Sequence, residues 1–147
     1  MSEMKNFKVD FVDRTLSIIR NNDVRTEYDV TLLLNCLLGM ITLPIELFKD
    51  EKSKSKVEDY KINCILKLKS FVLPKKIDKR DEEAFRHIRN SIAHLELEPK
   101  NENGVISSIR FKDKNEKGTV VLDFTIEVGK LKEFAIYVAE EYLKIIR

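Results

Sequence analysis

The chain has 147 residues, of which 43% are hydrophobic and 35% are charged, and its formal net charge is +2. This length and apolar content predict a single domain over residues 1–147 with a substantial buried core. The small net charge is not that of a general nucleic-acid binder, and no apolar run has the length and flanks of a membrane span or a signal peptide, so we expect a cytoplasmic protein without a membrane partner.

The first third of the chain predicts two helices. Apolar residues at helical spacing predict a helix over residues 6–20, which a run of Asn and Asp ends. Thr26 followed by Asp29 resembles a capping box, with aspartate in place of the usual glutamate, and marks the start of a long second helix. Because proline cannot donate a helical hydrogen bond, Pro44 is expected to kink this helix or end its regular part.

The middle of the chain is basic. Residues 50–60 are rich in lysine, serine and glutamate and predict an exposed, mobile connection, after which residues 62–73 predict a shorter helix. Ten basic residues stand against three acidic ones between Lys52 and Arg80, a local net charge of about +7. Such a run is usually a solvated face, and a phosphate-binding strip is the alternative. Both cysteines lie in apolar stretches and are expected to be packed free thiols.

A fourth helix is expected to begin between residues 78 and 81, with acidic residues in its first turn, where the helix dipole favours anions. Pro99 prevents it from continuing far beyond Leu97. Its buried stripe is predicted from apolar residues at spacings of three and four. These residues are Phe85, Ile88, Ile92 and Leu95.

The pattern of apolar residues changes after a turn at Asn103-Gly104. Residues 105–111 and 119–126 alternate between apolar and polar and predict a β-hairpin closed by a loop at 115–118. Helical spacing returns over residues 130–146. A lone hairpin is marginal in water, so it must pack on the helices. The expected fold is mainly α, an antiparallel bundle of four or five helices with a β-hairpin inserted before the last helix.

Three polar residues of the fourth helix point to phosphodiester chemistry. At about 100° per residue, Arg89 falls on the flank of the buried stripe, and Asn90 and His94 fall nearly opposite it, one turn apart. Arginine is a permanent cation suited to phosphate, and histidine can take and give a proton near neutral pH. The other histidine, His87, lies seven residues from His94, and the chain has no metal-ligand pattern and no glycine-rich phosphate loop. We therefore expect neither a metal nor a cofactor.

The run Arg89-Asn90-Ser91-Ile92-Ala93-His94 resembles the Arg-x4–6-His signature of the HEPN superfamily, including the polar residue after the arginine. The flanking residues 85–88 and 95–98 resemble that superfamily too. So does the chain order of two helices, a basic connection, the motif helix and a final helix. The resemblance covers essentially the whole chain, and the hairpin resembles that of a small subfamily found on bacterial plasmids.

The resemblance implies an all-helical bundle that usually dimerises. It also implies metal-independent RNA cleavage, as in many members that are toxins or defence proteins, whereas a minority have lost activity and only bind. By position in the motif, Arg89 and His94 would be the catalytic pair, with Asn90 in support.

We therefore predict an endoribonuclease in which the 2′-hydroxyl of the RNA attacks the phosphate and leaves a 2′,3′-cyclic phosphate. His94 would be the general acid or base, Arg89 would hold the scissile phosphate, and Asn90 would position the imidazole or a phosphate oxygen. Further contacts to the RNA are expected from Ser91, Arg86, Lys75 and Lys76.

Two other interpretations stay open. The chain could be a catalytically silent RNA- or protein-binding module, such as one half of a toxin–antitoxin pair that binds an antitoxin protein. A plain helical interaction domain would explain everything except the clustering of Arg89, Asn90 and His94. We also expect a homodimer, since pairing the motif helix with its copy would gather both motifs in one basic cleft at the subunit boundary.

Overall fold

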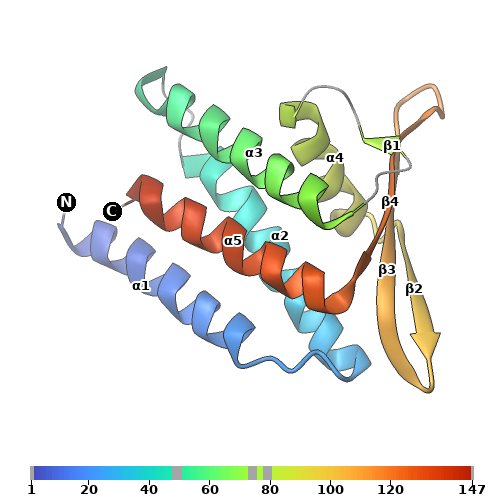
Figure 1. Ribbon diagram of the computed structural model, residues 1–147. Coiled ribbons are helices and arrows are strands. Elements are labelled where there is room, and N and C mark those ends of the chain that lie inside the picture. The colour runs from blue at the N-terminus through green and yellow to red at the C-terminus, as the bar shows by residue number, and fades with distance from the viewer. Residues whose placement is uncertain (1, 48–50, 73–75, 78–80, 147) are drawn as a thin grey trace.

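A computed structural model of the protein describes residues 2–47, 51–72, 76–77 and 81–146. The helices group together, and the sheet stands at one end of them, opposite the two termini (Figure 1). Within these ranges the elements are, in chain order, α1 (Ser2–Arg20), α2 (Glu27–Leu47), α3 (Glu51–Phe71), β1 (Lys76–Ile77), α4 (Asp81–Ala93), β2 (Leu97–Glu102), β3 (Val105–Lys114), β4 (Val120–Glu127) and α5 (Val128–Ile146).

The predicted capping box starts α2. The Thr26 N–H donates to Asp29 Oδ2 at 3.0 Å, and the Asp29 N–H donates to Thr26 Oγ1 at 3.2 Å. Because the N–H groups of Thr26 and Arg25 both donate to this carboxylate, they hold the pKa of Asp29 below its usual value. The helix then continues past Pro44 to Leu47, so this proline does not end it.

The prediction of an exposed connection over residues 50–60 is wrong for the part that the structure describes, because residues 51–60 belong to α3. Two apolar side chains in this polar stretch, Val57 and Tyr60, are buried. The Tyr60 hydroxyl also donates to the Met40 carbonyl at 2.9 Å, which ties α3 to α2. The buried positions continue at helical spacing through Cys64, Ile65 and Leu68.

The predicted hairpin is confirmed as β3 and β4, but it belongs to a larger sheet. The strand order is β1-β4-β3-β2, and all pairs are antiparallel. Phe111 on β3 lies opposite Phe124 on β4, and their rings stack with centroids 5.0 Å apart. The expectation of a hairpin alone beside the helices is therefore corrected to a four-stranded sheet packed on them, in which β1 has two residues.

The extra strand β2 follows from where the motif helix ends. The helix stops at Ala93, not near Leu97, and Pro99 lies inside β2 at the edge of the sheet, where a residue without an N–H is tolerated. The turn between β2 and β3 is the predicted one. Asn103 and Gly104 have φ values of 54° and 78°, the left-handed values that a two-residue hairpin turn requires.

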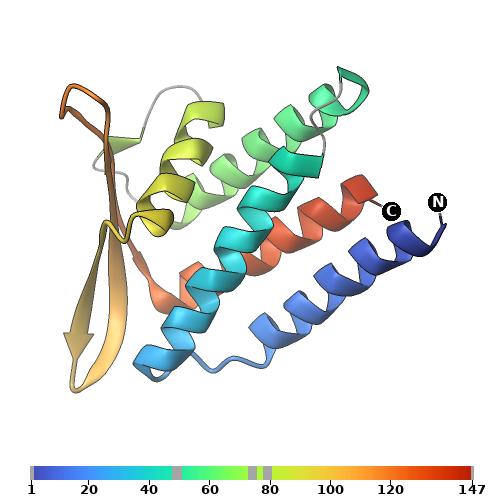
Figure 2. The same cartoon turned by 180° about the vertical axis from the view of Figure 1, so that it is seen from behind.

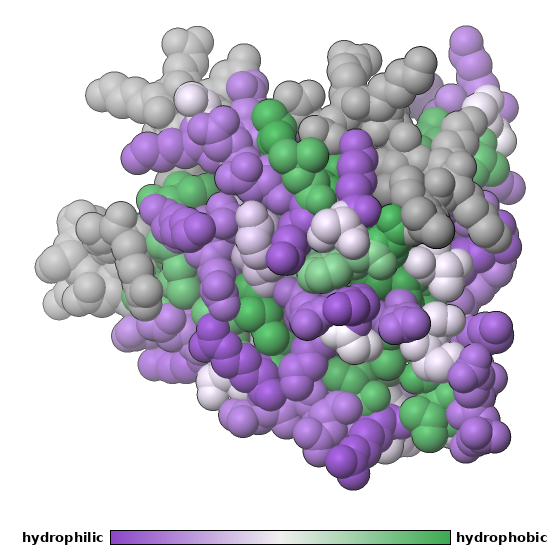
Figure 3. Space-filling view, in the orientation of Figure 1, coloured by the Kyte–Doolittle hydropathy of each residue, from purple (hydrophilic) through white to green (hydrophobic). Residues whose placement is uncertain are grey.

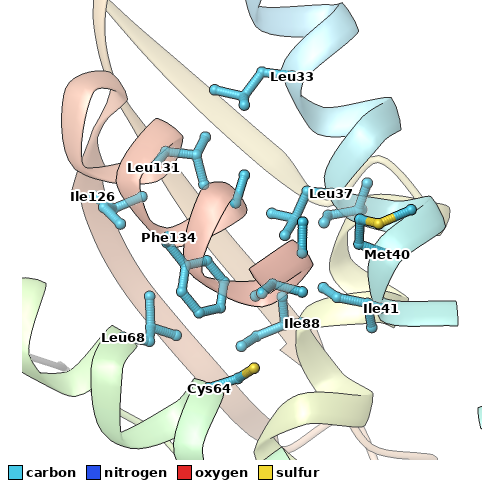
Figure 4. Close-up of a cluster of buried hydrophobic side chains, with 14 of the residues drawn as sticks. Leu33, Leu37, Met40, Ile41, Cys64, Leu68, Ile88, Ile126, Leu131 and Phe134 are labelled. Carbon is cyan, nitrogen blue, oxygen red and sulfur yellow. The ribbon is translucent and has the colours of Figure 1, made fainter. Parts of the chain in front are cut away.

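Helices and sheet share one core. One face of the sheet packs on α4 and α5, and α5 also contacts α1, α2 and α3. Figure 4 shows buried side chains from α2, α3, α4, β4 and α5 converging.

Cys36 and Cys64 are free thiols, as predicted, and burial raises the pKa of Cys64. No helix among the described residues is long and apolar enough to cross a membrane.

The outer face of the sheet is polar and carries paired charges. Arg110 donates from Nε and Nη2 to the two carboxylate oxygens of Asp123, each at 2.7 Å. Glu98 accepts a hydrogen bond from Lys112 Nζ at 2.9 Å, which lowers the pKa of its carboxyl. On the side of the molecule where the helices face the viewer, Figure 3 shows hydrophilic side chains with hydrophobic patches between them.

Candidate functional site

The motif helix α4 lies between the sheet and the other helices (Figure 2). Three apolar residues of the predicted stripe, together with an alanine, are buried against this core. The polar side behaves differently: the Arg86 side chain is exposed, and Arg89 and Asn90 are half-buried. The buried residues are Ala84, Phe85, Ile88 and Ile92.

The helix ends at Ala93, one residue before the end of the motif, in a Schellman turn. Leu95 has a φ of 55°, in the left-handed region, and 79% of its surface is exposed. Its predicted place in the buried stripe is therefore wrong, because a left-handed residue leaves the helix. This conformation costs a residue with a β-carbon about 1–2 kcal/mol. The closing hydrogen bonds run from His94 N–H to the Asn90 carbonyl (2.9 Å), from Leu95 N–H to Ile92 (3.1 Å) and from Glu96 N–H to Ser91 (2.8 Å).

Ser91 fastens this turn to the sheet. Its side chain is fully buried, and its hydroxyl donates to the Glu96 carbonyl at 3.0 Å. The same oxygen accepts the Lys112 N–H of β3 at 3.2 Å. Ser91 thus supports the turn that carries His94, and its hydroxyl contacts the chain rather than the outer surface, where the sequence suggested a contact to RNA.

Helical geometry directs Arg89 and His94 to different sides of the end of α4. His94 is exposed just beyond Ala93, while Arg89 Nη2 lies 3.5 Å from Asn90 Oδ1, a long hydrogen bond. Five residues correspond to about 140° around a helix, so one chain presents the cation and the imidazole in different directions. Asn90 lies between them in sequence and its side chain contacts Arg89.

A buried polar pair that was not predicted from the sequence lies next to the motif. His87 Nδ1 and Asp113 Oδ2 are 2.7 Å apart, and these side chains are only 6% and 8% exposed. Asp113 takes the inward position that follows Ile109 and Phe111 on β3, where alternation calls for an apolar residue. Burying a carboxylate is costly unless it is paired. In the sequence, the one sign of this pair is that Asp113 continues the series of apolar inward positions on β3.

A pocket of about 460 Å³ opens beside this pair, between α4 and the loop that joins β3 to β4. Asn90 and Arg86 line it from the helix, and Lys114 and Lys117 line it from the hairpin. Asn90 therefore belongs both to the motif and to the pocket. No sequence pattern links these two lysines to the motif helix, because only the folded hairpin brings them to it.

The structure describes only part of the basic segment between Lys52 and Arg80, here called the basic strip. Lys75 lies outside the described residues, and of Lys76 the structure describes the backbone, which pairs with Asp123 in the sheet. One lysine of the strip, Lys67, has its ammonium 5.2 Å from the centre of the Phe71 ring. RNA binding by this strip stays a prediction. Among the residues that the structure describes, no three His, Cys, Asp or Glu side chains are grouped so that they could hold a metal ion.

Comparison with known protein families identifies this chain as similar to one of them. A family model described as HEPN pEK499 p136 matches residues 1–147, the whole chain. Neither a curated protein nor a solved structure matches the chain.

Proposed function

The chain belongs to the HEPN family, in the small plasmid-borne subfamily that residues 1–147 match, and from this premise we propose that it is a metal-independent endoribonuclease. The observation that carries the proposal is the end of α4. There a buried serine and a Schellman turn fix the backbone, while Arg89, Asn90 and His94 reach the surface. A site held by rigid elements is what positioned chemistry requires.

In the proposed reaction the 2′-hydroxyl of the RNA attacks the adjacent phosphorus, and the bond from phosphorus to the 5′-oxygen breaks. His94 takes the proton of the 2′-hydroxyl or gives one to the leaving oxygen. Arg89 offsets the charge that grows on the non-bridging oxygens, which is where a fixed cation lowers the barrier most. Asn90 orients the guanidinium through its amide oxygen. The biological setting that we propose is that of a toxin or a defence protein.

The alternative is a catalytically silent module that binds RNA or an antitoxin protein. The angle of about 140° between positions 89 and 94 favours it for an isolated chain, because the two groups do not converge on one phosphate. The same residues would then hold a phosphate group without cutting the strand.

We propose that a homodimer brings the arginine of one chain and the histidine of the other close enough to act on one phosphate. Pairing the exposed side of α4 with its copy would bring two Arg89 and two His94 side chains to one cleft, in an isologous interface. Sedimentation velocity should therefore show a dimer, and dilution to monomer should remove cleavage together with the dimer. A stable monomer that cleaves at full rate would contradict this arrangement.

The function itself is tested with a labelled RNA and a DNA of the same sequence. Purified protein should cut the RNA in the presence of EDTA and leave the DNA intact, because DNA lacks the 2′-hydroxyl nucleophile. Equal cutting of both strands, or activity that EDTA abolishes and magnesium restores, would overturn the proposed mechanism. Binding of the RNA without cutting would favour the silent module.

A further inference from the structure

The pocket beside the motif has features of a binding site that the proposed chemistry does not use. Three of the six buried polar or charged side chains in the described part of the chain, His87, Ser91 and Asp113, lie on α4 or on β3, which packs against it. Ser91 supports the turn, but the pair of His87 and Asp113 serves no part of that turn. Such a pair can often be replaced by apolar residues without loss of stability, so stability alone does not account for two polar groups at an inward position.

The hairpin is irregular at the pocket. The pairing of β3 with β4 shifts register between Asp113 and Lys114. A β-bulge redirects the side chains next to it, and bulges are common beside binding sites. Here the shift lies between the buried carboxylate and the first lysine of the pocket. Lys114 is exposed, whereas the preceding inward position is buried.

The loop that carries the second lysine is held by its own hydrogen bonds. Asn115 Oδ1 accepts the N–H of Lys117 at 3.0 Å and that of Thr119 at 2.9 Å. The backbone of Asn115 also donates to the Thr119 carbonyl at 2.9 Å, and Gly118 has a φ of 79°. The backbone at Lys117 is therefore ordered before any ligand binds, which reduces the entropic cost of binding.

The charges of the pocket fit an anion. The pocket is lined by three basic residues, Arg86, Lys114 and Lys117, and by two acidic ones, Glu116 and Asp113. The carboxyl group of Asp113 already has a partner, because it lies 2.7 Å from His87 Nδ1. Lysine and arginine are the side chains that most often contact the phosphates of a nucleic acid. The volume of about 460 Å³ is within the usual range for small-ligand sites.

We propose that this pocket is a second subsite for the RNA strand, which holds the phosphate of a nucleotide next to the cleaved one. This inference rests on the proposed ribonuclease function and adds how the substrate is placed. Asn90 contacts Arg89 and also lines the pocket, so a strand that leaves the scissile position along α4 enters the pocket directly. The pocket then sets which phosphate reaches Arg89 and His94.

The test removes both pocket lysines, Lys114→Ala with Lys117→Ala. The control removes two exposed cations elsewhere, Lys100→Ala on β2 with Arg14→Ala on α1. Binding is measured with a fully 2′-O-methylated RNA, which cannot be cut by its own 2′-hydroxyl. The pocket variant should bind about tenfold or more weakly, since each lost bond involves a charged group. Its slope of log affinity against log salt should flatten by roughly 0.7 per lost phosphate contact. The control should match the wild type.

Kinetics on ordinary RNA separate the subsite from the chemistry. KM should rise about tenfold, in line with the lost binding, whereas kcat should stay close to that of the wild type and the positions of cutting should become less uniform. A pocket variant with unchanged binding, KM and cutting positions, in a protein that cleaves RNA, would overturn the subsite alone. A wild-type protein that binds the 2′-O-methylated RNA through these lysines but never cleaves RNA would overturn the ribonuclease and keep the pocket as a binding site.

Discussion

Arg89→Ala and His94→Ala should each lower the single-turnover rate of RNA cleavage by about 10²–10⁴-fold. General acid–base catalysis by a positioned side chain contributes about this much, and so does one fixed charge on the developing oxyanion. Both residues lie outside the buried stripe of α4. The free energy of unfolding should therefore change by less than about 0.5 kcal/mol, as for most surface substitutions.

A matched control for the arginine is Arg14→Ala, which removes an exposed arginine from α1, away from the motif. It should leave the cleavage rate unchanged. If His94→Ala unfolds the protein, the histidine is structural and the functional interpretation loses its main support. If both variants cleave RNA as fast as the wild type, the motif is not the site of chemistry.

His87→Ala should lower the free energy of unfolding by about 3–5 kcal/mol. It leaves the Asp113 carboxyl group buried without the imidazole that now lies 2.7 Å away, and removing one partner of a buried polar pair of this kind has this order of cost. Unfolding in urea, followed by circular dichroism, measures the difference. The double variant His87→Phe with Asp113→Leu replaces both polar groups by apolar ones and should be within about 1 kcal/mol of the wild type.

The single and the double variant separate two explanations of the His87–Asp113 contact. If the contact stabilises the fold, the double variant should lose as much stability as the single one. If the contact adds no net stability, only the single variant should lose stability, because it leaves one buried group without its partner. A loss below about 1 kcal/mol for His87→Ala would mean that water reaches the carboxylate in the folded protein, against its burial. Ile92→Ala, a truncation in the core, gives the scale of comparison at about 2–5 kcal/mol.

The features that could be predicted from sequence are those in which a short segment satisfies its own hydrogen bonds. Thr26 and Asp29 bond to each other across three residues, and Asn103-Gly104 is a turn that needs no distant partner. The β3–β4 hairpin is similarly local, since its two strands alternate in register around one loop. The family resemblance likewise followed from a contiguous motif and the order of elements.

The features that were missed depend on partners that are distant in sequence. Residues 51–60 look like a linker by composition, but Val57 and Tyr60 are buried against other helices. Leu95 fits the apolar period of α4, but a turn forms there instead, because the Ser91 hydroxyl donates to the Glu96 carbonyl and accepts the Lys112 N–H of β3. Strand β2 forms because β3 offers an edge to pair with, and no local pattern marks it.

The candidate site divides in the same way. Arg89, Asn90 and His94 were predicted from helical spacing and from the contiguous motif, without the structure. The pocket needed the structure, because Lys114 and Lys117 are more than twenty residues from α4 in the sequence and reach it only through the hairpin.

The measurement that tests the central claim most directly is the chemistry of the cleaved ends. An RNA with one preferred cutting position is digested in EDTA, and the fragments are weighed by mass spectrometry. The same RNA with a single 2′-O-methyl group at that position is digested in parallel. The account predicts a 2′,3′-cyclic phosphate on the upstream fragment, a 5′-hydroxyl on the downstream one, and no cleavage at the methylated position. A 3′-hydroxyl with a 5′-phosphate, or cutting of the methylated RNA at the same position and rate, would contradict it.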